Sequence, residues 1–269
     1  MRMLKQSIYN WATVKVLWWR DVLRFTREPS RIAGALGQPL IFWCVLGGGF
    51  AESFKMPNSA IDYKTYFYPG VILMIALFAS IFASVSVIED KQHGFLQAVM
   101  AGPGSRGSLV FGKMLGSASV ALLQVSLFLM LSPLAGFSWA HVNWPLLTVT
   151  LLLTTCALSV FGFAVAWLLN STQAYHAVQM TLLVPLWVIS GAMFPVPSHT
   201  GVFWAMMVCN PIAYAVSLVR ESLTWGGTGA GIAGAAGIDA TLSSIPFALG
   251  VLVVFAIVSF YGALFACKK

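Results

Sequence analysis

Charged side chains are scarce in this sequence and missing from its long middle. Lys, Arg, Asp and Glu make up 9% of the 269 residues, and none of them occurs from 114 to 219. Soluble domains carry roughly 25% charged residues, because their surface must stay hydrated and dispersed. Hydrophobic residues reach 59%, above the roughly 45–50% of soluble domains. The absence of charge therefore excludes a water-soluble fold and predicts an integral membrane protein.

Two further absences bear on the source of energy. The sequence has no G-x-x-x-x-G-K-[ST] phosphate loop, so the chain is not expected to hydrolyse ATP itself. The predicted spans also lack a central carboxylate, which proton- or sodium-driven transporters use for coupling. The acidic residues near the spans lie at or beyond their ends: Glu52, Asp62, Glu89, Asp90 and Asp239. Both absences favour energy supplied by a separate protein outside the membrane.

Cysteine is rare and scattered, at Cys44, Cys156, Cys209 and Cys267. These residues show neither a CxxC spacing nor a Cys/His ligand pattern, so no metal site and no disulfide framework are predicted. The net charge of +7 does not indicate nucleic-acid binding, because the basic residues lie beside apolar spans. In that position they indicate which side of the membrane each loop lies on. We therefore expect no metal, no cofactor and no nucleic acid on this chain.

Six uncharged apolar windows are long enough to cross a bilayer, which takes about 20 residues per helix. They cover 32–51, 65–88, 114–137, 146–169, 177–194 and 243–266. Backbone polar groups inside hydrocarbon must bond within their own segment, so these windows are predicted to be helices. The sequence thus predicts an all-α integral membrane fold, with 32–269 as a single transmembrane domain.

The basic residues are unevenly divided between the two sides of the membrane. With the N-terminus inside, twelve of the 15 Lys and Arg lie on the cytoplasmic side, in 1–31, 89–113 and 268–269. The other side holds Lys55, Lys64 and Arg220. Because Lys and Arg are enriched in cytoplasmic loops, both termini are predicted to be cytoplasmic. We expect the membrane to be a bacterial inner membrane.

Residues 1–31 have the pattern of an amphipathic helix. Apolar side chains recur at steps of three, four or seven, whereas Arg20, Arg24 and Arg27 lie off that stripe. Such a helix lies in the membrane interface, with tryptophan at headgroup depth and cations near anionic lipid. The alternative is a plain positive-inside flank, for which a few cations would be enough. The apolar stripe consists of Leu4, Ile8, Trp11, Trp18, Val22 and Phe25.

The region 195–242 does not have the pattern of a simple span. Its apolar part, 202–219, is interrupted by Asn210-Pro211, and 226–237 is rich in glycine. A full crossing here would make the number of spans odd and place the C-terminal lysines outside. A re-entrant or external helical hairpin between the fifth and sixth spans avoids both, provided that protein buries its irregular backbone. We prefer the hairpin to a full crossing.

The cytoplasmic loop 89–113 contains a short predicted helix with one apolar face, ended by the Gly102-Pro103-Gly104 run. A solvated loop does not need four large apolar residues on one side, so this face is expected to dock onto another protein. The alternative is that it folds back onto the membrane surface. The face consists of Phe95, Leu96, Val99 and Met100.

Gly112 and Gly116 are spaced as a small-xxx-small pair near the start of the third predicted span. Such pairs let two helices approach closely, so tight helix packing is predicted here, with a role in dimerisation as the alternative.

Three stretches together resemble the type-2 ABC exporter permeases, and the resemblance covers nearly the whole chain in order. The first is similar to the family's cytoplasmic loop, although a common family form has Glu at Gln97. It comprises Glu89-Asp90-Lys91, Gly94-x-Leu96, Pro103, Arg106 and Gly112-Lys113. The second, Ser190-Gly191-Ala192-Met193-Phe194-Pro195, is similar to the end of the family's fifth helix. The third, Trp204 through Asn210-Pro211-Ile212-Ala213-Tyr214 and then Arg220, is similar to the stretch before its last span.

This resemblance implies a transport subunit rather than an enzyme. It implies two permease copies paired with two ATP-binding subunits, which hold the ATP and Mg²⁺. Residues 94–100 would be the coupling helix, and 195–225 would dip into the outer leaflet. The residues assigned to coupling are Glu89, Gly94, Phe95, Leu96, Val99, Met100 and Pro103. Those assigned to the re-entrant motif are Ser190, Gly191, Pro195, Asn210, Pro211 and Arg220.

An uncharged pathway between two copies would suit a hydrophobic or amphipathic substrate, such as a drug-like compound, a lipid or a lipid-linked glycan. Alternating access would move it out of the cytoplasm. Two other functions stay open: a secondary transporter or channel that needs no ATPase, and a membrane assembly scaffold. Side chains available to line the pathway are Phe42, Trp43, Met180, Trp187 and Met193, with packing or lipid contact as the alternative for each.

Overall fold

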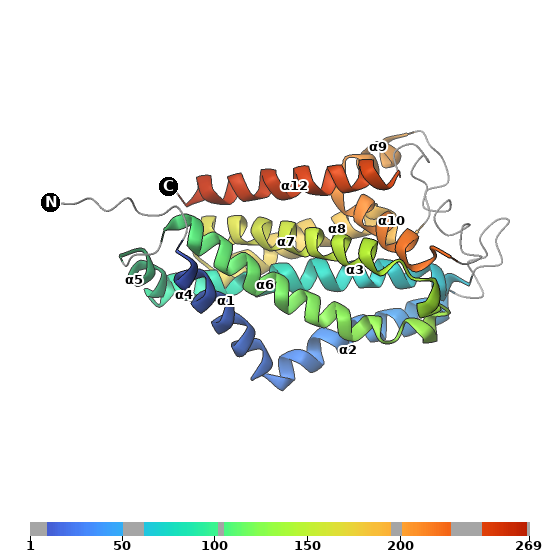
Figure 1. The fold of residues 1–269 in the computed structure, drawn as a ribbon, viewed down its shortest axis with the longest axis horizontal. Helices are drawn as coiled ribbons and strands as arrows, with labels where there is room; N and C mark the ends of the chain where they lie inside the picture. The colour runs from blue at the N-terminus through green and yellow to red at the C-terminus, as the bar shows by residue number, and fades with distance from the viewer. Residues whose placement is uncertain (1–9, 51–61, 102–104, 195–200, 227–243, 268–269) are drawn as a thin grey trace.

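The computed structural model describes residues 10–50, 62–101, 105–194, 201–226 and 244–267. Within these ranges every regular element is a helix (Figure 1). Pro103, Pro195 and residues 227–242 lie outside the described residues, so their predicted roles stay predictions.

Six helical segments are long and apolar enough to cross a membrane, which confirms the predicted all-α fold with six spans. Helices of about 20 residues cover the roughly 30 Å of a bilayer's hydrocarbon core. The six are α2 (Pro29–Gly49), α3 with α4 (Tyr63–Ala83 and Val85–Gln92), α6 (Arg106–Leu129), α7 (Trp144–Leu168), α8 with the π-helix η3 (Thr172–Trp187 and Val188–Ala192) and α12 (Ile245–Ala266). The shorter helices are α1 (Trp11–Thr26), α5 (Phe95–Ala101), α9 (Val202–Val208), α10 (Pro211–Leu223), η1 (Ser132–Ala135) and η2 (Trp139–His141).

Polar side chains cap several helices where they begin. Ser105 Oγ accepts a hydrogen bond from the Ser108 N–H at 3.1 Å, and Asn143 Oδ1 accepts one from the Leu146 N–H at 3.1 Å. Each cap satisfies a first-turn N–H that has no partner within its helix. Because Ser105 caps α6, this helix begins well before the span predicted at 114–137, and Lys113 lies inside it.

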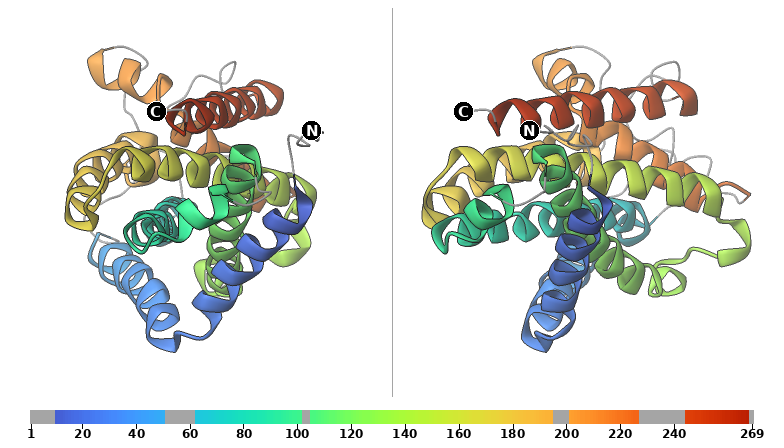
Figure 2. Two further views of the ribbon diagram at one scale, coloured as in Figure 1. Left: turned by 90° about the vertical axis from the view of Figure 1, so that its left-hand side faces the viewer. Right: turned by 60° about the vertical axis from the view of Figure 1, so that its left-hand side comes forward.

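Helix α3 forms the centre of the bundle, as the end-on view shows (Figure 2). Every residue from Tyr66 to Leu77 is buried, because α2, α6, α7 and α10 all pack against this helix. Helix α12 packs along α7 with one narrow face, and its other faces expose large apolar side chains such as Val254, Val258 and Phe265. A helix that is apolar all round is stable only in a protein core or in lipid, so these outer faces are suited to lipid.

The molecule has two distinct ends (Figure 1). Helices α4 and α5, the start of α6 and the end of α12 gather at one end, called here the α5 end. Helices α9 and α10 both lie toward the opposite end, called here the α9 end. Between α9 and α10 the chain bends by 75° at Asn210-Pro211, so the pair is either a broken span or a hairpin.

Helices α1 and α2 form an open elbow against the side of the bundle (Figures 1 and 2). Helix α1 packs along α6, where a Cβ on Gly112 would come within 3.0 Å of Leu17 and one on Gly116 within 2.9 Å of Asp21. The spacing of these two glycines predicted close helix packing, and the structure confirms it.

Helix α1 packs against α6 through a face that overlaps the predicted apolar stripe only at Phe25, and the position of the stripe in the membrane interface stays a prediction. The structure buries Val14, Leu17 and Phe25, whereas Trp11 is exposed and Trp18 and Val22 are half-buried. The difference arises because α6 offers a glycine-lined surface that accepts the Val14 side of the helix. Of the predicted stripe, Leu4 and Ile8 lie outside the described residues.

Candidate functional site

A short helical hairpin projects at the α5 end of the molecule, formed by α4 and α5 (Figure 1). Gly94 makes the turn with φ of +73°, a left-handed conformation that costs glycine little. Of the predicted docking face, Leu96 is buried, and Phe95 and Val99 are half-buried against the protein's own core. The side chains of α5 that are exposed are Gln97, Ala98 and Ala101. The Met100 side chain and Pro103 are outside what the structure describes.

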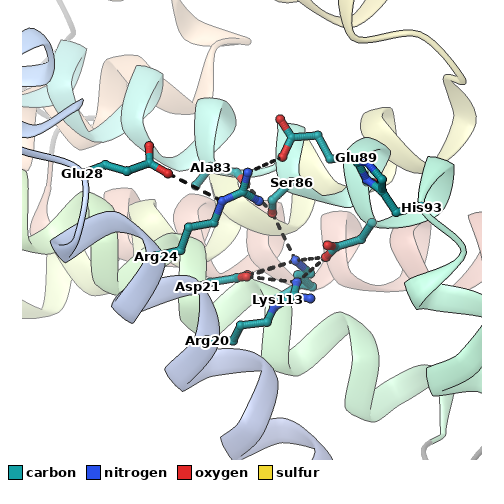
Figure 3. A network of polar contacts seen from close by, with 10 residues as sticks. Arg20, Asp21, Arg24, Glu28, Ala83, Ser86, Glu89, His93 and Lys113 are labelled. Carbon is teal, nitrogen blue, oxygen red and sulfur yellow. Dashed lines mark hydrogen bonds and ion pairs between the residues drawn. The ribbon is translucent and has the colours of Figure 1, made fainter. Parts of the chain in front are cut away.

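A buried network of charges holds this hairpin to α1 and α6 (Figure 3). Lys113 on α6 is 1% exposed, and its Nζ lies 2.6 Å from Asp90 Oδ2 and 3.1 Å from Asp21 Oδ2. The same ammonium group donates a hydrogen bond to Ser86 Oγ at 3.1 Å. The three acceptors come from α1 and α4, so one lysine joins three helices.

Two arginines of α1 extend the network toward α4 and α5. Arg20 pairs with Asp90, and its guanidinium lies 4.2 Å from the centre of the Phe95 ring. Burial acts to lower the pKa of Arg20, but the hydrogen bond to Asp90 and the charge of Asp21 outweigh it, so the pKa is raised. Arg24 Nη2 lies 2.8 Å from Glu89 Oε2.

The buried and the exposed ion pairs contribute different amounts to the stability of the fold. Removing one partner of a buried ion pair costs about 3–5 kcal/mol, because the other charge is left without compensation. Arg24 and Glu89 are 42% and 30% exposed, and pairs of that kind contribute about 0–1 kcal/mol. Lys113 and Asp90 therefore carry most of the electrostatic stability that joins α1, α4 and α6.

Helix α4 is also tied to the turn between α7 and α8. Lys91 Nζ donates to the Trp167 carbonyl at 3.1 Å and to Asn170 Oδ1 at 2.7 Å. The Gln92 amide donates to the Asn170 carbonyl at 2.9 Å. The α4–α5 hairpin is thus held on both sides, by α1 and α6 and by the turn between α7 and α8.

The residues of the predicted re-entrant motif meet in the other half of the bundle. Gly191 has φ of +73° inside η3, and its carbonyl accepts hydrogen bonds from Tyr66 Oη at 2.9 Å and Arg220 Nη2 at 2.8 Å. Arg220 is fully buried, and its guanidinium lies 4.1 Å from the centre of the Tyr66 ring. A cation at the carbonyl end of a helix also opposes the negative end of the helix dipole. Arg220 therefore fixes the break at the end of α8.

Asn210 joins α10 to α8. Its Oδ1 accepts from the Ile212 N–H at 3.0 Å, which caps α10, and its Nδ2 donates to the Leu186 carbonyl at 2.6 Å. Pro211 occupies the first helical position, where a missing N–H costs nothing. Ser190 Oγ donates to the Trp187 carbonyl at 2.6 Å, within its own helical segment. The structure thus brings Ser190, Gly191, Asn210, Pro211 and Arg220 into one region.

Comparison with known proteins agrees with this arrangement. The family model for the ABC-2 type transporter matches residues 12–224, which include α1, the α4–α5 hairpin and α10. This chain belongs to the ABC-2 type transporter family. Proteins of this family typically work with an ATP-binding subunit.

Several relatives of this ABC-2 family member are named as transport permeases or as nodulation proteins. A protein named as transport permease ycf38, from Cyanophora paradoxa, is 24% identical over 76% of this chain and 72% of its own length. Nodulation protein J of Neorhizobium galegae is 23% identical over 82% of this chain and 83% of its own length. A protein named as multidrug ABC transporter permease YbhR, from Escherichia coli, is 23% identical over 61% of this chain and 45% of its own length.

The five side chains predicted to line a pathway do not converge within one copy of this ABC-2 permease. Trp43 and Trp187 are buried and donate hydrogen bonds to the Lys64 and Gly70 carbonyls. Phe42 and Met180 are exposed, and Met193 is half-buried. A cavity of about 430 Å³ lies elsewhere, in the angle of the α1–α2 elbow, and none of the five lines it. Their pathway role stays a prediction about two copies.

The described part of the permease contains no group of three or more His, Cys, Asp or Glu that could hold a metal ion. Its charged clusters consist of carboxylates already paired with Lys or Arg.

Tyr66 is a residue of the motif region that could not be identified from the sequence, because an aromatic residue in an apolar span is usually a packing residue. Lys113 was placed in the cytoplasmic loop, and no signal in a single sequence pairs it with Asp21.

Proposed function

We propose that this permease subunit takes up the movement of a separate ATPase through the α4–α5 hairpin and exports its substrate. The observation that carries the proposal is the position of Lys113 among Asp21, Asp90 and Ser86, which joins the projecting hairpin to α1 and α6. A hairpin held this way moves with the spans instead of bending on its own.

In the proposed cycle two copies of the permease bind two ATP-binding subunits on the cytoplasmic side. ATP and Mg²⁺ bind to those subunits and bring them together. The displacement passes through Gln97 and Ala98, the exposed part of α5, into α4. From α4 the ion pairs carry it to α1 and α6, and the pathway between the two copies opens on the other side.

In this proposal both termini and the α5 end lie in the cytoplasm of a bacterial cell and the α9 end lies outside. The excess of Lys and Arg in 1–31 and 89–113 supports this orientation. In the same frame α9 and α10 form a re-entrant hairpin in the outer leaflet. The 75° bend supports it, because Asn210 Oδ1 accepts from the Ile212 N–H and Tyr214 Oη donates to the Val208 carbonyl, so protein groups satisfy backbone at the bend.

The proposed substrate is hydrophobic or amphipathic, such as a drug-like compound, a lipid or a lipid-linked glycan. The exposed apolar side chains of α2 and α8, including Ile41, Phe42 and Met180, support this choice, because two copies meeting there would enclose an uncharged surface. Similarity to a protein named as a multidrug ABC transporter permease points in the same direction.

The test is co-purification of the tagged permease with an ATP-binding subunit from its native membrane. Ala98→Asp places a charge on the exposed face of α5, so it should reduce the amount of bound ATPase at least tenfold while the permease stays folded. Ala140→Asp is the matched control, because Ala140 is an exposed alanine on η2, away from the α5 end. This control should keep the ATPase bound.

Two results would contradict the proposal. An ATPase that stays bound to Ala98→Asp as well as to Ala140→Asp would remove α5 from the contact. Substrate efflux by a purified permease that has no ATPase partner would favour a secondary transporter or channel instead.

A further inference from the structure

The span formed by α3 and α4 is interrupted at Ser84. On each side of this residue a backbone hydrogen bond joins positions three apart instead of four. The Ser84 N–H donates to the Ile81 carbonyl at 2.9 Å, and the Val87 N–H donates to the Ser84 carbonyl at 3.0 Å. A short 3₁₀-type break within a longer helix often marks a hinge. Residues 80–87, called here the Ser84 junction, therefore separate the buried helix α3 from the helix that carries α5.

Serine side chains of the Ser84 junction bond back to the helix backbone. Ser84 Oγ donates to the Ser80 carbonyl at 3.3 Å. Ser86 Oγ donates to the Ala83 carbonyl at 2.8 Å. Serine hydroxyls that bond to a carbonyl three or four residues earlier compete with the backbone bonds of a helix and often bend it. These two bonds indicate that the span bends more easily here than elsewhere.

Tyr175 of α8 supplies a third hydroxyl to the Ser84 junction. Its Oη donates to the Ile81 carbonyl at 2.9 Å, and the side chain is 1% exposed. The same carbonyl accepts the Ser84 N–H, so Tyr175 stabilises the broken turn itself. Helix α7 also lies close to the junction, since a Cβ on Gly162 would come within 2.8 Å of Ser84 Oγ. Tyr175 thus joins the junction to α8.

Helix α8 contacts the rest of the bundle along one narrow stripe. Most of its side chains are exposed, and the buried ones are spaced four residues apart, at Tyr175, Gln179, Leu183 and Trp187. Tyr175 and Trp187, at the two ends of the stripe, both donate hydrogen bonds to backbone carbonyls of α3. Between them, Gln179 Nε2 is buried without a hydrogen-bond partner among the described residues. Tyr175 therefore anchors the first half of α8 to α3.

The far end of α4 is joined to the residues just before α8. Lys91 Nζ donates to Asn170 Oδ1, and the Gln92 amide donates to the Asn170 carbonyl. A bend at Ser84 would therefore displace the first turns of α8 as well as α4. Because Tyr175 lies in those first turns, its hydrogen bond to α3 opposes such a bend.

Two buried hydroxyl groups beside the Ser84 junction have no hydrogen-bond partner among the described residues, Ser80 Oγ and Ser159 Oγ. The carbonyls of the same two residues lie 3.3 Å and 3.4 Å from Ser84 Oγ. Unpaired buried hydroxyls make the observed arrangement less stable. A different bend, in which they reach a carbonyl, is favoured correspondingly, which narrows the free-energy gap between the two arrangements.

We propose that Tyr175 is a positioning residue for the movement of the α4–α5 hairpin. Its hydrogen bond to the Ile81 carbonyl holds the Ser84 junction in the observed bend, and loss of this bond lets α4 and the first half of α8 move together. The inference deepens the proposed function, in which the exposed face of α8 meets a second copy. It rests on that function only for the source of the movement, since the bond and the bend belong to a single chain.

The test is hydrogen exchange, measured by mass spectrometry on the full-length permease in nanodiscs without an ATPase. Amide exchange of a helix reports how often it opens locally. Tyr175→Phe removes one hydrogen bond, so exchange in 84–92 and 172–180 should become about fivefold faster, while exchange in 66–77 stays unchanged. Tyr68→Phe is the matched control, because Tyr68 is also buried and donates to a backbone carbonyl, that of Phe128 at 2.7 Å. It should leave exchange in 84–92 at the wild-type rate.

Ser84→Ala separates a positioning role from a general structural one. Alanine removes the hydroxyl that competes with the backbone bonds of the helix, so exchange in 84–92 should become slower than in wild type. If the two side chains only stabilised the fold, exchange would become faster in both variants. Faster exchange in Ser84→Ala, or a Tyr175→Phe effect no larger than that of Tyr68→Phe, would overturn the inference.

A second measurement separates this inference from the proposed function. In the complex with the ATPase, a non-hydrolysable ATP analogue should speed exchange in 84–92 and 172–180 of wild type, and less so in Tyr175→Phe, which has already lost the bond. An equal effect in the two proteins would overturn the link to α8. Exchange effects in a permease that captures no ATPase would support the inference and contradict the proposed function. ATPase capture with wild-type exchange in Tyr175→Phe would do the reverse.

Discussion

Lys113 shows how one residue can determine the contacts of three helices. Its ammonium group is buried within 3.1 Å of both Asp21 and Asp90, so deleting it leaves these two carboxylates to share Arg20. We expect Lys113→Met to lower the free energy of unfolding by about 3–5 kcal/mol. Thermal unfolding in detergent, followed by intrinsic fluorescence, measures the loss.

Two comparisons make the Lys113 prediction specific. Lys15→Met, at an exposed lysine of α1, should change the unfolding temperature little. Adding Asp90→Asn to Lys113→Met should recover part of the loss, because the surplus negative charge is reduced. Equal destabilisation by the Lys15 and Lys113 variants would contradict the buried network.

Tyr66 gives a second prediction at this scale, through the Gly191 carbonyl that it shares with Arg220. Tyr66→Phe removes one hydrogen bond but keeps the ring under the guanidinium, so it should cost about 1 kcal/mol. Arg220→Met should cost more, since it removes the remaining bond and the charge. Thermal unfolding measures both, with Tyr261→Phe at an exposed tyrosine of α12 as the control. A Tyr66→Phe effect no larger than that of the control would argue against the shared carbonyl.

Some of these residues can be predicted from the sequence and others cannot. The spacing of Gly112 and Gly116 predicts tight packing because small residues at one helix face have few other uses in a span. Lys113 was assigned to a solvated loop, because its two carboxylate partners are distant in sequence and only the fold brings them together. Tyr66 was missed for the same reason, since its acceptor lies on another helix.

At the scale of elements, α3 and η3 touch at backbone distance. A Cβ on Gly70 would come within 2.4 Å of the Ala192 carbonyl oxygen. We expect Gly70→Ala to push the two helices apart, break the nearby Trp187 hydrogen bond to the Gly70 carbonyl, and lower both the unfolding temperature and the yield of monodisperse protein. Gly262→Ala is the control, since a Cβ there meets nothing within 4 Å. Similar behaviour of the two variants in gel filtration and thermal unfolding would contradict this contact.

The α9–α10 pair yields a prediction about topology. In a re-entrant hairpin both ends lie on the same side, so Val202→Cys and Trp225→Cys should both react with an impermeant thiol reagent added outside intact cells. Both positions are exposed, and the native cysteines are replaced first. Labelling of only one of the two from outside would show a full crossing instead.

The number and type of the membrane-spanning elements could be predicted from the sequence, whereas their boundaries and bends could not. Six uncharged windows predict six spans because unpaired charge is excluded from hydrocarbon. The start of α6 was placed too late, since a charge that is paired within the protein need not mark the end of a helix. The bend at Asn210-Pro211 could be located from the cap and the proline, but its angle depends on the contacts of Asn210 with α8.

At the scale of the whole molecule, several side-chain contacts join the projecting α4–α5 hairpin to the spans. Helix α4 is held to α1 and α6 by Lys113, and to the α7–α8 turn by Lys91 and Gln92. Leu96 is buried in the same core, so α5 is also anchored from within. If α5 is the contact for the ATPase, as proposed, we expect a force applied there to reach several spans through these contacts.

If α5 contacts the ATP-binding subunit, as proposed, site-specific photo-cross-linking should capture the two proteins at this helix. A photoreactive amino acid is placed at Gln97, on the exposed side of α5, and in a second protein at Ala140 on η2. After irradiation of native membranes, we expect a cross-linked product of permease and ATP-binding subunit from position 97 and none from position 140. The absence of that product at 97, or its equal formation at both positions, would show that α5 is not the contact.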